Sequence, residues 1–154
     1  MACVTLYLEN EVATLELGKR IALLCPHQLF IIHLEGELGA GKTTLTRGLL
    51  HALGHTGNVK SPTYTIVERY DLEHRTVFHF DLYRVADPEE LDYLGLDDYL
   101  SNQSLCIIEW AKQGQGYLPT PDLVITFTYQ NDGRQAELSP QTEAGHTLLE
   151  KLNK

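Results

Sequence analysis

The spacing of apolar and polar residues divides the first third of the chain into strands and helices. Alternating apolar positions predict a short strand over residues 4–8. Asn10 is a suitable N-cap for a helix over residues 11–24, in which apolar residues recur at helical spacing. The almost continuous apolar run at 29–35 is typical of a strand buried on both faces, and a second helical pattern follows at 42–53.

Beyond residue 60, short apolar runs alternate with turn residues. Asp87 and Pro88 combine an acidic N-cap with a proline in the first turn, which predicts a helix that ends at residue 94. Residues 131–134 separate two apolar runs as a hairpin turn does. The other predicted elements are strands over residues 65–70, 76–82 and 104–110, a hairpin of strands over 123–129 and 135–138, and a last helix over 140–152.

A glycine-rich turn joins the second predicted strand directly to the next helix. Gly36, Gly41, Lys42 and Thr43 match the phosphate-loop pattern G-x-x-x-x-G-K-[ST], and Gly39 lies between them. Glycines let successive backbone N–H groups point at phosphate oxygens with no Cβ in the way, and the helix start adds its positive dipole end. Lys42 is expected to reach the β- and γ-phosphates, and the Thr43 hydroxyl to bind Mg²⁺. The turn therefore predicts a nucleotide-binding site.

Strand–helix alternation around this phosphate loop predicts the fold class. We expect a three-layer α/β domain of the P-loop NTPase type with a mostly parallel central sheet. The two late strand pairs are expected to add antiparallel edge strands. The chain shows no repeat, linker or low-complexity segment, so residues 1–154 are predicted to form a single P-loop ATPase domain.

Two strand-end carboxylates are candidates to complete the site. Asp81 and Glu109 each end an apolar run, and ligands of open α/β sheets lie beyond the carboxyl ends of the strands. One of them is expected to hold Mg²⁺ and the other to orient or deprotonate the attacking water, and the sequence does not divide these roles. Thr63 and Thr65 lie where a mobile loop would bring a hydroxyl near the γ-phosphate, although both also fit ordinary loop and strand positions.

Composition narrows the class of protein. The net charge of −9 makes this chain a poor candidate to grip a nucleic-acid backbone by itself, so any RNA is expected to be held by a partner. No apolar run approaches the length of a membrane span, and the first residues do not resemble a signal peptide. Cys3, Cys25 and Cys106 are far apart and odd in number, which favours reduced core thiols in a cytoplasmic protein.

Two other short patterns lack the sequence context of the functions that they usually indicate. Residues 92–95 spell D-x-x-G but lie in a predicted helix, and no N-K-x-D follows, so a GTPase is not expected. His51 and His55 are four residues apart, but they lack the glutamate of H-E-x-x-H and Gly54 interrupts the helix, so zinc is not expected.

The motifs together closely resemble the bacterial TsaE (YjeE) family, over essentially the whole chain and in the same order. The resemblance implies an ATPase that works with the TsaB–TsaD heterodimer to form N6-threonylcarbamoyladenosine in tRNAs that read codons beginning with A. TsaD performs the transfer in that family, so tRNA is contacted only through partners. The segments that carry the resemblance are residues 36–44 (G-E-L-G-A-G-K-T-T), 61–65 (S-P-T-Y-T), 79–84 (H-F-D-L-Y-R), 87–91 (D-P-E-E-L) and 108–110 (I-E-W).

The resemblance also implies roles for single residues. Thr43 and Glu109 would ligate Mg²⁺, Asp81 would belong to the catalytic surroundings with Lys42, and Trp110, the only tryptophan, would occupy a functionally sensitive position. The residues that would hold the phosphates of ATP are Gly39, Ala40, Gly41, Lys42, Thr43 and Thr44, and those near the adenine or ribose are Asn10, Thr14 and Arg134. Gly36 is a nucleotide-binding candidate through the phosphate-loop pattern.

Two other function classes stay open. A small-molecule P-loop kinase has a similar length, but it needs an arginine-bearing lid, and the loop at 114–121 has no arginine. A nucleotide-sensing binding module would bind ATP with little turnover. The sequence shows no second-substrate pocket, which favours an ATPase whose turnover depends on partner proteins.

Overall fold

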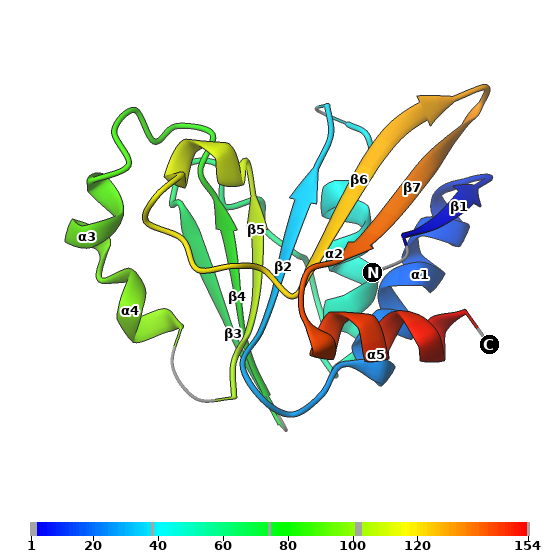
Figure 1. Cartoon of the computed structure of the whole chain (residues 1–154), viewed down its shortest axis with the longest axis horizontal. Helices are drawn as coiled ribbons and strands as arrows, with labels where there is room; N and C mark the ends of the chain where they lie inside the picture. Colours follow the sequence, from blue (N-terminus) through cyan, green and yellow to red (C-terminus); the bar gives the residue numbers. More distant parts are fainter. Residues whose placement is uncertain (1–2, 38, 74, 101–102, 154) are drawn as a thin grey trace.

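Seven strands form one mixed sheet in the order β1-β7-β6-β2-β5-β4-β3 (Figure 1). The computed structural model describes residues 3–37, 39–73, 75–100 and 103–153. The strands are β1 (Val4–Leu8), β2 (Phe30–Glu35), β3 (Val67–Leu72), β4 (Arg75–Asp81), β5 (Leu105–Glu109), β6 (Leu123–Gln130) and β7 (Gly133–Pro140). The helices are α1 (Glu11–Leu24), α2 (Lys42–Ala52), α3 (Glu90–Leu94), α4 (Leu96–Tyr99), α5 (Glu143–Leu152) and the short 3₁₀ helix η1 (Ala111–Gly114).

The centre of the sheet is parallel and its edges are antiparallel. The pairings β6–β2, β2–β5 and β5–β4 are parallel, whereas β1–β7, β7–β6 and β4–β3 are antiparallel. The predicted antiparallel edges and parallel centre are both present, and the sheet as a whole is mixed, since three of its six pairings are parallel. Two of the antiparallel pairs, β3–β4 and β6–β7, are hairpins, and strands joined by a short turn must run antiparallel, whereas a parallel pair needs a crossover. The third, β1–β7, joins strands from opposite ends of the chain.

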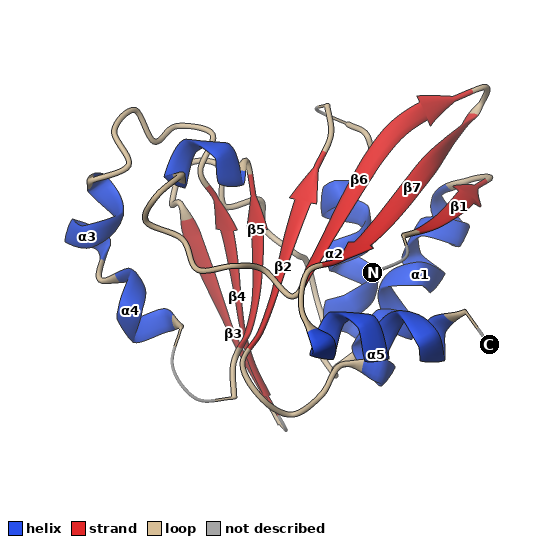
Figure 2. Cartoon of the chain, viewed as in Figure 1, coloured by secondary structure: helices blue, strands red, loops and turns tan. Residues whose placement is uncertain are grey.

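Helices cover both faces of the sheet, as Figure 2 shows. Successive residues of β2 point to opposite faces, so Ile32 joins the core beneath α1, α2 and α5, while Ile31 joins a second core beneath α3 and α4. Both residues are almost wholly buried, which explains the uninterrupted apolar run of this strand. The predicted α/β arrangement of layers is therefore present.

Glycines allow α1 and α2 to approach closely. A Cβ at Gly18 would lie 2.2 Å from the backbone oxygen of Leu45, and a Cβ at Gly48 would lie 2.3 Å from the backbone oxygen of Leu15. No side chain fits in either place, so the two helices cross at backbone contact. This contact fixes the start of α2, and with it the end of the glycine-rich turn, against the rest of the fold.

Local signals placed most elements correctly and erred at a few ends. Asp87 accepts a hydrogen bond from the Glu89 N–H as a cap does, but residues 87–89 form a turn and α3 begins only at Glu90. The last helix begins at Glu143, since Pro140 still pairs in β7 and Thr142 is the N-cap. The short helices α4 and η1 were not expected.

A buried guanidinium ties together the amino ends of the central strands. Arg75 opens β4 and is 7% exposed. Its terminal nitrogens donate to the carbonyl oxygens of Pro26 and Gln28, each at 2.5 Å, and to that of Ser104 at 3.5 Å. Burial lowers the pKa of Arg75. These bonds join the strand to the segments that precede β2 and β5, at the edge of the sheet away from the glycine-rich turn.

In the part of the chain that the structure describes, none of the helices combines the length and apolar character needed to cross a bilayer. All three cysteines are free thiols; Cys25 and Cys106 are buried as expected, whereas Cys3 is exposed and is not a core residue.

Candidate functional site

The glycine-rich turn between β2 and α2 has the backbone shape that the motif requires. Gly36, Gly39 and Gly41 have positive φ angles of 140°, 78° and 121°, which residues with side chains rarely adopt. At Gly36 a Cβ would also lie 2.8 Å from the carbonyl oxygen of Phe127 on β6. The loop therefore curls tightly against the sheet and leads directly into the amino end of α2, where backbone N–H groups are free to bind an anion.

Lys42 is buried at the start of α2. It is 4% exposed, its ammonium donates to the carbonyl oxygen of Gly36 at 2.8 Å, and it lies 4.2 Å from the centre of the Trp110 ring. Burial lowers the pKa of Lys42, and the carboxylates of Glu109 and Asp81 act in the opposite direction. A cation held inside the protein next to two carboxylates is positioned to pair with an anionic ligand.

Asp81 and Glu109 are adjacent at the carboxyl ends of β4 and β5. They are in register across the parallel pair and are 5% and 4% exposed. Thr63 donates its hydroxyl to one oxygen of Asp81 at 3.0 Å, and the Tyr83 N–H donates to the other at 2.9 Å. The strands thus bring together the two predicted acids, and the loop at 61–66 brings Thr63 to them. Thr65 instead donates to Glu68 at 3.0 Å.

His79 is a site residue to which sequence reasoning gave no role. Its Nε2 lies 2.6 Å from a carboxylate oxygen of Glu109, and the imidazole is wholly buried. In the tautomer that carries its proton on Nε2, the imidazole donates to this carboxylate oxygen. Within the described ranges Nδ1 has no hydrogen-bond partner. The one available signal was spacing, because His79 precedes Asp81 by two residues and therefore shares a face of β4 with it.

Trp110 follows Glu109 in a strained conformation. Its φ angle is +57°, in the left-handed region that a bulky residue seldom adopts. The indole packs on the ring of Tyr83 at 4.9 Å and on the Lys42 ammonium. The unusual backbone turns the indole from the end of β5 toward the phosphate loop.

A cavity of about 270 Å³ lies on one side of the glycine-rich turn. Asn10, Thr14 and Arg134 line it together with Gly39, Gly41 and Thr44 of the turn. Asn10 also caps α1 by accepting from the Ala13 N–H, and Arg134 donates to the carbonyl oxygen of Gly39 at 3.5 Å. Three residues that are distant in sequence from the turn therefore border it directly.

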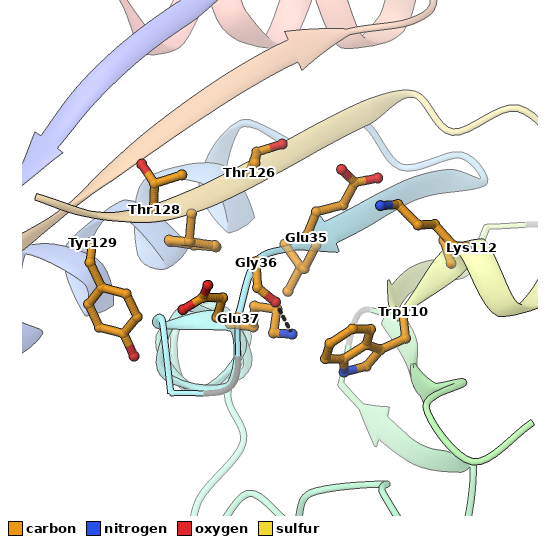
Figure 3. Close-up of a pocket in the computed structure, with 12 residues that line it drawn as sticks. Glu35, Gly36, Glu37, Trp110, Lys112, Thr126, Thr128 and Tyr129 are labelled. Carbon is orange, nitrogen blue, oxygen red and sulfur yellow. Dashed lines mark hydrogen bonds between the residues drawn. The ribbon is translucent and has the colours of Figure 1, made fainter.

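A larger cleft of about 590 Å³ lies on the other side of the turn (Figure 3). Its walls come from the end of β2, from β6 and from the segment that begins at Trp110, and Lys42 is also in its lining. Two cavities therefore flank the glycine-rich turn. Its other lining residues are Leu34, Glu35, Gly36, Glu37, Ala111, Lys112, Thr126, Phe127, Thr128 and Tyr129.

The donor set suits Mg²⁺ only if the nucleotide supplies part of it. Among the described residues, no three His, Cys, Asp or Glu side chains are grouped closely enough to hold a metal by themselves. Mg²⁺ prefers hard oxygen ligands and usually keeps waters and phosphate oxygens besides one or two protein ligands. The exposed Thr43 hydroxyl at the start of α2 and the Glu109 carboxylate are oxygen donors of this kind.

Comparison with known proteins points to one family. Residues 8–137 match the family described as threonylcarbamoyl adenosine biosynthesis protein TsaE. The chain is 48% identical over 153 residues to the tRNA threonylcarbamoyladenosine biosynthesis protein TsaE of Haemophilus influenzae, with 97% of each chain covered. It is 42% identical over 102 residues to the Bacillus subtilis protein of that name, and this match covers 66% of this chain and 63% of the relative. The crystal structure of Bacillus subtilis YdiB matches with a TM-score of 0.84 at 30% identity, covering 99% and 95% of the two chains.

Proposed function

The chain belongs to the TsaE family, and from this premise we propose that it is a Mg²⁺-dependent ATPase that assists the TsaB–TsaD heterodimer in the cytoplasm. The product of that assembly is N6-threonylcarbamoyladenosine in tRNAs that read codons beginning with A. The observation that carries the proposal is the buried Lys42 ammonium, which lies at the amino end of α2 and faces the adjacent carboxylates of Asp81 and Glu109.

Binding of ATP follows from the turn and from its smaller cavity. The backbone amides from Gly39 to Thr44, together with Lys42, would hold the phosphates. Asn10, Thr14 and Arg134 line the 270 Å³ cavity beside these residues, which is where the ribose and adenine would lie. The nucleoside would therefore leave the turn on the side opposite the larger cleft.

The chemistry would take place at the ends of β4 and β5. Mg²⁺, held by Thr43 and Glu109, would offset charge on the phosphates. The Lys42 ammonium would add a fixed positive charge in a site with little water, where charge has its greatest effect. Asp81, held in place by Thr63 and by the Tyr83 N–H, would accept a hydrogen bond from the attacking water and orient it.

His79 would act as a positioning residue. Its bond to one oxygen of Glu109 restricts rotation of the carboxylate and leaves the other oxygen for Mg²⁺. Because the imidazole is wholly buried, it would act through Glu109 and not on the nucleotide itself.

The partner requirement follows from charge. With a net charge of −9 the chain is poorly suited to hold tRNA directly, so tRNA would be contacted through TsaB–TsaD. Hydrolysis would then change the state of the assembly and would not modify a small molecule.

The test is ATP hydrolysis by the purified chain alone, with TsaB–TsaD, and with small phosphoryl acceptors. We expect saturable binding of Mg²⁺-ATP by calorimetry and turnover that rises only when TsaB–TsaD is added. A phosphorylated acceptor would instead support a small-molecule kinase, and binding without turnover in every mixture would support a nucleotide sensor. No binding of Mg²⁺-ATP, alone or with partners, would reject all three.

A further inference from the structure

The larger cleft opens onto the reacting side of the proposed nucleotide site. Lys42 lines this cleft, whereas Asn10, Thr14 and Arg134 line the other cavity. Its volume of about 590 Å³ is in the range of sites that hold a ligand. In Figure 3 the indole of Trp110 and the side chains of Thr126 and Thr128 lie on opposite sides of this space. A group entering here would meet the terminal phosphate of ATP and not its base.

The chain has no arginine in this cleft. All six of its arginines lie in the described ranges, and none of them is in the lining of the cleft. Arg84, the one that follows β4 near the site, lies 4.3 Å from the Tyr64 ring. Arg134 lines the smaller cavity and lies 4.1 Å from the ring of Tyr129, which borders the larger cleft. Of the remainder, Arg20 donates to the carbonyl oxygen of Leu152, Arg47 pairs with Glu11, Arg69 pairs with Asp71, and Arg75 is fixed by backbone carbonyls.

The charges around the cleft favour a cationic occupant. Glu35 and Glu37 line it, and neither forms an ion pair with any residue of the described ranges. The Lys112 side chain extends toward Glu35 in Figure 3 and not toward the turn that carries Lys42. With a triphosphate bound, the two carboxylates and the phosphates would together exceed the charge of both lysines.

We propose that this cleft receives an arginine of a partner protein, which passes between Trp110 and β6 and brings its guanidinium to the terminal phosphate beside Lys42. The proposal rests on the proposed function, because it supplies the reason why turnover would depend on partners. The indole, which the Lys42 ammonium now contacts, would stack with the guanidinium once that ammonium turns to the phosphates, and the two glutamates attract the basic segment that carries it. An arginine supplied in trans accelerates phosphoryl transfer in other P-loop enzymes by about 10³- to 10⁵-fold.

The first experiment fills the cleft. Thr128→Trp places a large side chain in it from an exposed position on β6, and Thr5→Trp makes the same change at an exposed position on β1 that lines neither cavity. We expect both variants to keep the ATP affinity of the wild type. Stimulation of hydrolysis by TsaB–TsaD should fall at least about tenfold in Thr128→Trp only.

The second experiment identifies the arginine. Each exposed arginine of TsaB and TsaD is replaced by alanine, and binding and stimulation are measured separately. One replacement should reduce stimulation about 100-fold or more while the complex still forms, and added guanidinium chloride should restore part of the rate. Lys112→Ala should be stimulated like the wild type.

The outcomes separate this inference from the proposed function. If TsaB–TsaD stimulates Thr128→Trp as strongly as the wild type, or if stimulation survives every arginine replacement, the inference is overturned and the proposed function stands. Loss of stimulation in Lys112→Ala would place the second cation on this chain and also overturn it. A small acceptor whose phosphorylation Thr128→Trp blocks would make the cleft an acceptor site. If TsaB–TsaD does not stimulate the wild type, both proposals fail.

Discussion

The two ends of β4 hold buried charges in opposite ways. At its start, the Arg75 guanidinium donates to three backbone carbonyls, although its Nε has no partner among the described residues. At its end, Asp81 lies beside Glu109 and near Lys42, whose ammonium donates to the carbonyl of Gly36. A charge surrounded by its own hydrogen bonds stabilises the fold, whereas a buried cation with one neutral acceptor and two carboxylates nearby is positioned to pair with an anionic ligand.

The two ends of β4 also differ in how the desolvation of the buried cation is compensated. Desolvation lowers the pKa of both Arg75 and Lys42, so burial disfavours the charged form of each side chain. For Arg75 the compensation is permanent, since backbone carbonyls cannot leave. For Lys42 it would arrive with the triphosphate. Changes at the two ends should therefore separate stability from activity.

Lys42→Ala is expected to have the largest effect and to confine it to function. Removing the cation should weaken ATP binding about 100-fold and abolish measurable turnover, because the triphosphate loses its main fixed countercharge. Calorimetry and a phosphate-release assay measure the two effects. The thermal midpoint should change little, since removing the desolvated cation offsets the loss of its attraction to Asp81 and Glu109. Normal hydrolysis in this variant would reject the site.

Arg75→Met should lower stability and leave ATP binding unchanged. The loss of its charged hydrogen bonds to the carbonyls of Pro26, Gln28 and Ser104 should lower the free energy of unfolding by about 3 kcal/mol. Urea denaturation measures this change. ATP affinity, determined at a temperature where the variant remains folded, should match that of the wild type. A stable variant with impaired ATP binding would remove the distinction between the two ends of the strand.

Glu109→Gln tests whether the carboxylate serves catalysis more than binding. The amide keeps the shape of the side chain but is a poor Mg²⁺ ligand, so kcat should fall about 100-fold. Binding of ATP measured without Mg²⁺ should change little. Unchanged turnover would remove Glu109 from the mechanism.

His79→Leu and His79→Gln sharpen the same point. Leucine cannot donate to Glu109, so kcat should fall about tenfold and more Mg²⁺ should be needed for half-maximal rate. Glutamine can place an N–H near the position of Nε2 and should restore part of both values. ATP affinity without Mg²⁺ is the control, and an equal loss in both variants would indicate that His79 serves packing alone.

The smallest expected effect is a change in the fluorescence of Trp110 when ATP binds. Its indole lies 4.2 Å from the Lys42 ammonium, which is expected to turn toward the phosphates when ATP binds. Fluorescence of this single tryptophan should therefore change on addition of Mg²⁺-ATP and stay constant in Lys42→Ala. A silent signal in the wild type would place the ring outside the influence of the nucleotide.

Much of the site was predictable because its signals are local. The glycines and Lys42 are consecutive in the chain, so their spacing alone specifies the curled turn and the helix that follows it. Asp81 and Glu109 could be named because each ends an apolar run, and Asn10 because it caps a helix. Thr65 shows the limit, since nothing in its neighbourhood indicated that it would bond Glu68 while Thr63 bonds Asp81.

The sequence by itself determined the family, the phosphate loop and nearly every strand and helix, because these depend on residues that are neighbours in the chain. Only the tertiary structure decided that three of the six strand pairings are parallel, that His79 meets Glu109, and that a cleft opens beside Lys42. Those features depend on which strands lie side by side. That order is set by the joint packing of two cores on opposite faces of the sheet, which no local pattern encodes.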